Sequence, residues 1–266
     1  MSDLLAVVLG NTTAVLAVVR GPHHPERGRG AACRDAFSDP VRAPPDRLDD
    51  LRDELAKAER GCSGKAIPVI VASVNPPALK RFRQLAADVL RAPPLVAGED
   101  FPIPIRCEAK PPERVGADRL LAALAAHHRA KGACVAVDFG TAITVNAVRA
   151  DGTFLGGAIF PGLAMMTRAL AEGTALLPEI SPSEHAPAVG TNTQEAISAG
   201  LIRGTAGAVA ALIREMRQTV GSGAPVFLTG GTAPWIAPHL SPDCRRIVPN
   251  LVLEGLVLAY RQSRPQ

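Results

Sequence analysis

Two short segments of the chain place polar residues directly after an apolar run, an arrangement that can bind an anion or a cation. Residues 135–148 read VAVDFGTAITVNAV, with Asp138, Gly140 and Thr141 between two apolar stretches. This pattern predicts a strand, a glycine-centred turn and a returning strand. A carboxylate and a hydroxyl beside a glycine, whose backbone a ligand can approach, suit a cation or a phosphate. The alternative is a plain hairpin in which Asp138 and Thr141 only hydrogen-bond the backbone of the turn.

The second segment lies near the N-terminus and repeats this pattern. Residues 7–19 read VVLGNTTAVLAVV, again with a glycine and a threonine between apolar runs. Aligning Gly10 with Gly140 gives an offset of about half of the chain, which indicates a duplicated unit. Two such turns, one opening each half, could hold the phosphates of a nucleotide between them. This alignment places Val8 opposite Asp138, so only the second copy carries a carboxylate at this position.

Composition bounds the class of protein. The 266 residues suffice for one large domain or two ordinary ones. Hydrophobic residues make up 47% and charged residues 20%, which is typical of a globular chain. The net charge is +4, but only 3% of residues are aromatic and no basic run interleaves with them, so no nucleic-acid partner is expected. A mildly basic surface would suit an anionic substrate such as ATP.

Cysteine usage and the N-terminal residues indicate a compartment. The cysteines are odd in number and widely spaced, which argues against a disulfide framework and a zinc site and fits a reducing cytosol: Cys33, Cys62, Cys107, Cys134 and Cys244. The first apolar run lacks a basic leader and is interrupted by Gly10, so it reads as a strand and not a signal peptide. No apolar stretch is long enough to span a bilayer. We therefore expect a cytoplasmic protein without a membrane partner.

Periodicity and turn residues predict an α/β chain in both halves. For the first half we expect a hairpin, a helix capped by Asp46, a buried strand, a second helix and two short strands, at residues 4–19, 46–61, 66–74, 78–90, 95–96 and 103–105. His23 and His24 fall in a segment rich in Pro, Gly and Arg that reads as a solvated loop.

For the second half we expect helices at 120–128, 163–172 and 251–260, the hairpin at 135–148, and strands at 156–162 and 225–228. A proline-rich loop is expected at 174–187, and a short helix around Trp235. A long helical stretch at 193–216 is expected to be broken by glycines that permit close approach of a helix or ligand: Gly200, Gly204 and Gly207.

Three further motifs could carry chemistry. Residues 116–119 (GADR) begin a predicted helix, whose free N–H groups can bind an anion. Asp118 could take a proton from a hydroxyl, and Arg119 could hold a carboxylate or phosphate. The alternative is that Asp118 only complements the helix dipole. Residues 229–232 (TGGT) follow a strand, where glycines admit a ring or phosphate or simply make a turn. Residues 190–193 (GTNT) cap the next helix or face a small polar substrate.

Taken in order, these motifs resemble those of type III pantothenate kinases. The resemblance covers nearly the whole chain and rests on Gly10-Asn11-Thr12, GADR at 116–119, VDFGTAIT at 137–144, GGAIFPGL at 156–163, TALLPEI at 174–180, GTNTQEAISAGLIRG at 190–204, LTGGTA at 228–233 and LEGL at 253–256. It implies the acetate/sugar kinase, Hsp70 and actin superfamily: two ribonuclease-H-like α/β domains with ATP in the cleft between them.

The resemblance also implies a division of the chain and of its ligands. We expect a first domain at 1–112 with the first phosphate loop, and a second at 113–266 with GADR, the second phosphate loop and the adenosine motif. The C-terminal helix belongs to the second domain by sequence but could pack back on the first domain. Implied ligands are pantothenate, ATP, Mg²⁺ and a monovalent cation, K⁺ or NH₄⁺. The resemblance also implies a cytoplasmic homodimer with the pantothenate site at the subunit interface.

Roles carry over position by position. Asp118 matches the general base that deprotonates the pantothenate hydroxyl, Asp138 matches the ligand of the monovalent cation, and Thr193 matches a pantothenate contact. The substrate-binding set is Gly116, Ala117, Asp118, Arg119 and Thr193. The ATP-binding set is Val8, Leu9, Gly10, Asn11, Thr12, Thr13, Ala14 and Val15 in the first loop, with Thr141, Gly230 and Gly231.

Two positions depart from the family pattern. The family has Asp-x-Gly-Asn-Thr in the first loop, where the Asp is expected to organise the Mg²⁺-phosphate end, and Val8 cannot ligate a cation. The family often has an aromatic residue near the position of Ala109.

We predict ATP-dependent phosphorylation of pantothenate to 4'-phosphopantothenate, the first step of coenzyme A biosynthesis. The alternative is a catalytically impaired relative that acts as a ligand-binding or regulatory protein, because Val8 replaces the first-loop Asp. A sugar or acetate kinase of the same superfamily is disfavoured by the ordered GADR and GTNT motifs.

Overall fold

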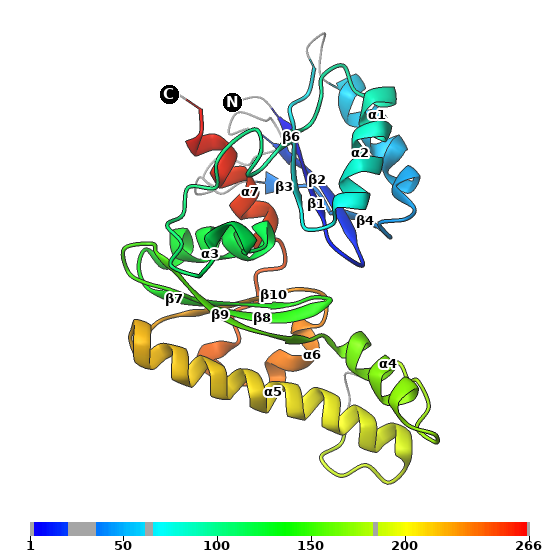
Figure 1. The fold of residues 1–266 in the computed structure, drawn as a ribbon, viewed down its shortest axis with the longest axis vertical. Coiled ribbons are helices and arrows are strands. Elements are labelled where there is room, and N and C mark those ends of the chain that lie inside the picture. The colour runs from blue at the N-terminus through cyan, green and yellow to red at the C-terminus, as the bar shows by residue number, and fades with distance from the viewer. Residues whose placement is uncertain (1–2, 21–35, 62–65, 183–185, 265–266) are drawn as a thin grey trace. The chain divides into compact units, whose positions relative to one another are not determined.

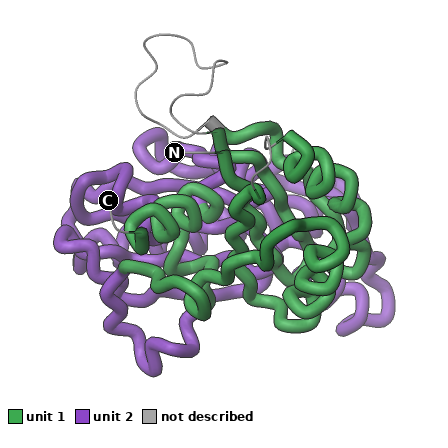
Figure 2. The backbone as a smooth tube through the Cα atoms, turned by 90° about the horizontal axis from the view of Figure 1, so that it is seen from above, with its two compact units in different colours: residues 1–104, 116–121, 252–266 green, residues 105–115, 122–251 purple. Residues whose placement is uncertain are grey.

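The computed structural model describes residues 3–20, 36–61, 66–182 and 186–264. They form two compact units (Figure 2). Unit 1 comprises Met1–Pro104, Gly116–Leu121 and Val252–Gln266, and unit 2 comprises Ile105–Val115 and Ala122–Leu251. Several sequence expectations lie outside the described residues: the loop with His23 and His24, and the residues Cys33 and Cys62.

These units differ from the expected division after residue 112. The start of the GADR helix and the C-terminal helix cluster with the N-terminal part of the chain, and Ile105–Val115 clusters with the second half. Within unit 1 the two late segments pack tightly, since a Cβ on Gly255 would overlap the Leu121 backbone. Contacts between segments far apart in sequence determine which segments belong to each unit. The periodicity of a helix does not predict such contacts.

Unit 1 is built on a six-stranded sheet whose main path runs β3-β2-β1-β5-β6 (Figure 1). Its strands are β1 (Leu4–Leu9), β2 (Ala14–Arg20), β3 (Ala36–Phe37), β4 (Val41–Ala43), β5 (Val69–Ser73) and β6 (Leu95–Val96), with β4 pairing β2. One face of β1 carries alternate apolar residues that form a core with the helices η1 (Leu48–Leu51), α1 (Arg52–Gly61) and α2 (Pro76–Val89): Leu5, Val7 and Leu9 with Leu51, Leu55 and Phe82. Figure 1 shows α1 and α2 on one side of this sheet and α7 (Leu251–Gln262) on the other.

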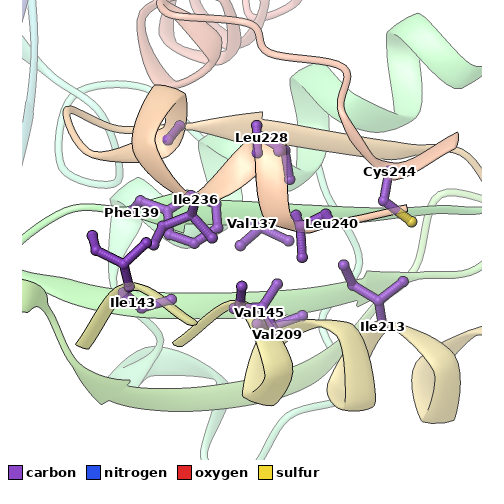
Figure 3. Packing of buried hydrophobic residues seen from close by; sticks show 14 of the residues in the cluster. Val137, Phe139, Ile143, Val145, Val209, Ile213, Leu228, Ile236, Leu240 and Cys244 are labelled. Carbon is purple, nitrogen blue, oxygen red and sulfur yellow. The ribbon is translucent and has the colours of Figure 1, made fainter. Parts of the chain in front are cut away.

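Unit 2 is built on a four-stranded sheet in the order β10-β7-β8-β9. Its strands are β7 (Cys134–Phe139), β8 (Ala142–Val148), β9 (Phe154–Pro161) and β10 (Val226–Thr229), and its helices include most of α3 (Ala117–Ala130) together with α4 (Leu163–Gly173), α5 (Thr193–Val220) and the short α6 (Ala233–Ile236). Val209 and Ile213 of α5 pack against Val137 and Val145 of the sheet (Figure 3). The expectation that no apolar stretch is long enough to span a bilayer is wrong for α5, which passes that test by length and composition. Its packing against the sheet makes it a core helix of unit 2.

The two sheets share one topology. In unit 1, β1 pairs antiparallel with β2 and parallel with β5; in unit 2, β7 pairs antiparallel with β8 and parallel with β10. Each hairpin is extended by a further antiparallel strand, β4 on β2 and β9 on β8. The structure thus repeats one unit in the two halves, as the offset between the two glycine motifs predicts.

Two local expectations are wrong, and the bounds of a third are too narrow. Asp46 lies in the turn closed by the Arg47 amide on the Pro44 carbonyl, and helix η1 begins after Arg47 without a side-chain cap. Residues 103–105 form no strand, because the neighbouring prolines lack the N–H that a ladder needs. The helix expected at 120–128 runs from Ala117 to Ala130, so GADR stands at its start as predicted.

The expected break in the long helix is also wrong. Helix α5 runs without interruption, and a Cβ at Gly200, Gly204 or Gly207 would meet no described atom within 4 Å. No helix approaches these glycines within the described part of the chain. Each glycine costs a helix about 1 kcal/mol, and the buried apolar face of α5 offsets this cost: Ile197, Ile202, Val209 and Ile213.

Candidate functional site

The first turn, residues 10–13, joins β1 to β2 and is held at two points. Its ends are linked by the Gly10 amide, which donates to the Thr13 carbonyl at 3.0 Å. Asn75, directly after β5, donates from Nδ2 to the Gly10 carbonyl at 3.2 Å, and its Oδ1 caps α2 by accepting from the Ala78 amide at 3.0 Å. Sequence reasoning missed this role of Asn75. An Asn directly before Pro-Pro at a helix start was the available signal.

Val8 occupies an apolar row at the end of this hairpin. It pairs with Val15 on β2 and with Ala72 on β5. Directly paired residues on neighbouring strands present their side chains on the same face of a sheet. Because the row consists of two valines and an alanine, neither Val8 nor its paired neighbours can ligate a cation.

The GADR motif lies beside the same strand ends, within unit 1. A Cβ built on Gly116 would lie 3.4 Å from Cγ1 of Val74, and the Val74 amide donates to the Leu9 carbonyl at 3.1 Å. The structure therefore places Gly116, and the start of α3 with it, next to the strand that carries the first turn. A Cβ at this position would lie 2.5 Å from Oδ1 of Asp118, so a larger residue here would displace that carboxylate.

Asp118 stands in the first turn of α3, half-buried. Its Oδ1 accepts a hydrogen bond from the Arg119 backbone N–H at 2.8 Å. Burial raises the pKa of the Asp118 carboxyl above its ordinary value, and this effect outweighs the hydrogen bond and the positive charge of Arg119. A carboxylate with a raised pKa is a stronger base than an exposed one, which suits proton abstraction from an alcohol.

The second turn, residues 140–141, gathers the predicted residues of unit 2. Asp138 pairs with Thr144 on β8 and with Thr229 on β10. A Cβ on Gly230, whose φ is +94°, would lie 2.5 Å from Oδ1 of Asp138, and one on Gly140 would lie 3.5 Å from it. The Asp138 carboxylate therefore lies close to the backbone of two glycines.

The segment after β10 reaches back to this turn. The backbone amide and hydroxyl of Thr232 approach the Phe139 carbonyl at 3.4 and 3.3 Å, and both donate to it. Gly231 stands in open space among the described residues, since a Cβ there would meet nothing within 4 Å. Directly after β9, the Gly162 amide donates to the Thr141 carbonyl at 2.9 Å. The structure thus brings Asp138, Thr141 and Gly230 together, with Thr232 as a residue that sequence reasoning included only as part of TGGT.

Thr193 belongs to the GTNT motif at residues 190–193. It is the first residue of α5, after the cap Asn192, whose Oδ1 accepts from the Glu195 amide at 2.9 Å. Glu195 in turn accepts from the amide and the hydroxyl of Thr191, both at 2.8 Å, and these bonds lower the pKa of Glu195. Among the described residues, Thr193 has no hydrogen bond to Asp138, Thr141 or Gly230. Most polar groups of GTNT therefore serve the helix cap, which leaves the exposed Thr193 available to a ligand.

Comparison with known proteins assigns the chain to a family. The model of a family described as type III pantothenate kinase matches residues 4–215. A type III pantothenate kinase from Rubrobacter xylanophilus is 38% identical over 269 residues, covering 97% of each chain. One from Thermomicrobium roseum is 34% identical over 261 residues, again covering 97% of each chain.

The chain belongs to the type III pantothenate kinase family. This membership confirms the family predicted from the ordered motifs, and with it the predicted pantothenate kinase function in coenzyme A biosynthesis and the use of ATP.

Solved structures confirm the predicted fold class. A Campylobacter jejuni protein assigned to the Baf family of transcriptional activators superposes with a TM-score of 0.60 at 18% identity, covering 97% of this chain and 98% of that one. The ethanolamine utilization protein EutJ from Carboxydothermus hydrogenoformans gives 0.53 at 18% identity, covering 97% and 90%. A glucokinase from an Antarctic psychrotroph gives 0.51 at 11% identity, covering 98% and 99%. At these identities the likeness shows the actin-like fold alone.

The residues of this family member differ in their fit to the implied cations. The oxygen-rich row at Asp138 fits a hard cation, although the Thr144 hydroxyl accepts from Asn146 Nδ2 at 3.0 Å and the Thr229 hydroxyl donates to the Pro249 carbonyl at 3.3 Å. The row at Val8 does not fit one. Among the described residues no three His, Cys, Asp or Glu side chains gather as a metal site. A cation at Asp138 would therefore need backbone, water or phosphate oxygens as further ligands.

The second departure from the family pattern lies in unit 2. Ala109 faces β9, where a Cβ on Gly156 would lie 3.8 Å from the Ala109 Cβ. Gly156 has a φ of +111°, which favours glycine. Two small residues therefore meet where the family often has an aromatic side chain nearby.

Proposed function

We propose that this chain transfers the γ-phosphoryl group of ATP to the hydroxyl of pantothenate, with Asp118 as the general base. The observation that carries the proposal is the placement of Asp118: half-buried, with a raised pKa, at a helix start beside the first turn. The new bond joins the pantothenate oxygen to the γ-phosphorus while the bond from that phosphorus to the β-γ bridging oxygen breaks. ADP leaves, and the hydroxyl proton passes to the Asp118 carboxylate.

The remaining roles are proposed on the same footing. Arg119 and the N–H groups at the start of α3 hold the anionic end of pantothenate, together with Gly116 and Ala117, and Thr193 contributes a hydroxyl to the substrate. The first turn, from Val8 to Val15, holds the phosphates through backbone amides and the hydroxyls of its threonines. This grip uses backbone and hydroxyl donors, since no Walker-type lysine is present in the motif.

In unit 2, Thr141 binds phosphate, and Gly230 and Gly231 form the adenosine side. The open backbone at Gly231 supports this role. Asp138 would hold the monovalent cation, K⁺ or NH₄⁺, and Mg²⁺ accompanies ATP. Such cations neutralise phosphate charge during phosphoryl transfer.

We also propose a cytoplasmic homodimer with the substrate site at the subunit interface. In its support, unit 2 leaves large apolar side chains exposed on and around α4 and in the segment before α5: Ile159, Met165, Leu176 and Val189. Leu176 is 92% exposed and Val189 79%. Exposed apolar groups of this size often mark interaction surfaces. Sedimentation analysis should give the mass of two chains, and Leu176→Glu combined with Val189→Glu should shift it toward one.

Val8 favours a second candidate, a ligand-binding or regulatory protein with little turnover. The apolar row of Val8, Val15 and Ala72 offers no ligand for the Mg²⁺-phosphate end of ATP. Under this candidate the chain binds pantothenate or ATP without releasing ADP at a useful rate.

One assay separates the two candidates. ADP release is measured with ATP, Mg²⁺, pantothenate and K⁺ or NH₄⁺ for the native chain, for Val8→Asp and for Val15→Asp. The control places the same carboxylate one strand away in the same row. Robust native turnover supports the kinase and rejects the regulatory candidate. Absent native turnover that Val8→Asp restores and Val15→Asp does not restore rejects the kinase.

A further inference from the structure

A groove in unit 2 lies outside the candidate site. It runs between the C-terminal half of α5 and the segment that follows α6, and has a volume of about 460 Å³. Small-molecule sites commonly span roughly 300–1,000 Å³. Thr193 stands at the opposite end of α5 from Arg214 on the groove wall, about 30 Å away by the usual rise of about 1.5 Å per residue. The groove is therefore remote from the proposed pantothenate contact.

The floor of the groove is apolar. Ile213, Leu240 and Cys244 line it, and each is at most 4% exposed. Figure 3 shows these three side chains near one another toward one end of the unit-2 core. Such a floor offers a short hydrocarbon body a surface to cover.

One wall carries a fixed guanidinium. Arg217 donates from Nε to the Ala224 carbonyl at 2.9 Å and from a terminal nitrogen to Asp243 Oδ2 at 2.6 Å, and its side chain is 18% exposed. Hydrogen bonds from Ser241 and Arg217 lower the pKa of Asp243 to about 2, so this pair stays ionised at physiological pH. Arg217 is thereby oriented in advance, and Asp243 balances its charge.

The same wall carries a second arginine, one helical turn earlier. Arg214 lines the groove, is exposed, and makes no ion pair with any described residue. Residues three apart on a helix lie on the same face, so Arg214 and Arg217 are neighbours. Because Asp243 balances Arg217, Arg214 gives the groove its uncompensated positive charge.

We propose that this groove binds a small amphiphilic anion, with a carboxylate or phosphate head on Arg214 and a short apolar body on Ile213, Leu240 and Cys244. The side chains of Gln218 and Ser222 border the groove and can donate hydrogen bonds to the head. A charged guanidinium above an apolar floor favours ligands that carry both an anionic and an apolar part.

The groove wall continues into a segment that touches the proposed adenosine side. Beyond Cys244 the chain runs beside β10: the Leu228 amide donates to the Arg246 carbonyl at 2.8 Å, and the Val248 amide donates to the Leu228 carbonyl at 2.7 Å. This contact lies two residues before Gly230. An occupied groove restrains this segment, so slower amide exchange at Leu228 and Val248 is expected on binding.

The test uses hexanoate and hexyl phosphate as probes, with hexanol as the uncharged control, titrated into the full chain by calorimetry and by protein-observed NMR. At least one anion should bind and hexanol should not, and the stronger of the two anions identifies the preferred head. Arg214→Ala should weaken binding by about tenfold, the usual effect of losing one charged hydrogen bond. Arg168→Ala, which removes an exposed charge elsewhere in unit 2, should leave binding unchanged.

A second pair of variants tests the location without altering charge. Ala210→Trp places an indole on the groove wall and should abolish binding, whereas Ala208→Trp, on the same helix but outside the groove, should not. Both alanines are exposed, so both variants should fold, which circular dichroism checks. The proposal is overturned if neither anion binds, or if binding survives both Arg214→Ala and Ala210→Trp. Neither result bears on pantothenate phosphorylation.

Discussion

Val8 in unit 1 lies between Val15 and Ala72, while Asp138 in unit 2 lies between Thr144 and Thr229. Both central residues stand at the last but one position of a strand that precedes a glycine turn. Each strand has one antiparallel and one parallel neighbour, β2 and β5 for β1, and β8 and β10 for β7. One row is wholly apolar and the other offers a carboxylate and two hydroxyls.

The backbone of the two turns is supported in a similar way despite this difference. In unit 1 the Val74 amide donates to the Leu9 carbonyl, and in unit 2 the Thr232 amide donates to the Phe139 carbonyl. In each case the segment after the parallel strand anchors the end of the hairpin. The two copies therefore share a backbone hydrogen bond at the end of the hairpin although only one of them carries a carboxylate.

The largest expected effect concerns the acid of unit 1, which lies on α3 and not in the turn. Asp118→Asn should lower kcat by about 10²–10⁴-fold, the usual contribution of a positioned general base, with a smaller change in the KM for pantothenate. Steady-state ADP release measures both constants. Near-native kcat in this variant would remove Asp118 from the role of base.

The pH dependence sharpens this assignment. Asp118 must be ionised to accept a proton, so kcat/KM should fall as the pH falls through a pKa above that of an ordinary Asp. The folded chain binds this proton more tightly than the unfolded chain, so the ionised carboxylate lowers stability at neutral pH, and this penalty disappears as the pH falls through the raised pKa. Asp118→Asn should therefore be more stable than the native chain at neutral pH. A destabilised variant would contradict the burial effect.

The next effect exchanges the chemistry of the two turns. Asp138→Val gives the second turn a side chain like that of the first, and activity should fall by about 10²-fold or more because the charge that would hold the cation is lost. Asp138→Asn keeps the shape and removes only the charge, so it should lose comparable activity. Rates measured across a KCl titration should lose their salt activation in both variants. Retained K⁺ activation would show that the two rows are not functionally different.

A smaller effect separates the two glycines at the end of β10. Gly230→Ala should destabilise the chain by about 2–4 kcal/mol, since the new Cβ meets the Phe139 backbone and a positive φ disfavours alanine. Gly231→Ala is the matched control and should change stability by less than about 0.5 kcal/mol, because its Cβ meets open space. Urea unfolding measures both. Equal losses of stability in the two variants would mean that the close approach of Gly230 to Phe139 and Asp138 does not make alanine unfavourable there.

The smallest effect concerns the residues that anchor the turns. Asn75→Ala loses a helix cap and the bond to Gly10, and should cost about 1–2 kcal/mol. Thr232→Val loses only the hydroxyl bond to Phe139 and should cost about 0.5–1.5 kcal/mol. Thermal unfolding of both variants tests the ranking. A larger loss of stability for Thr232→Val than for Asn75→Ala would contradict this ranking.

Much of the fold was predictable from local pattern. Alternating apolar residues around a glycine turn predicted both hairpins, now seen as β1–β2 and β7–β8, and Asn-Pro-Pro was a readable start for α2. Failures arose where a local signal competed with packing. Glycines suggested a broken helix at 193–216, but burial against the unit-2 sheet keeps α5 continuous. Ile103 and Ile105 suggested a strand, but Pro102 and Pro104 prevent pairing.

The sequence by itself determined the family, the two glycine turns and the absence of a carboxylate at Val8, because motif order and side-chain identity are local properties. Only the tertiary structure decided what surrounds those residues. The apolar neighbours of Val8, the contact of Gly230 with Asp138 and the burial that raises the pKa of Asp118 join segments far apart in the chain. Strand register and helix packing set those contacts, and neither is encoded in the spacing of a single motif.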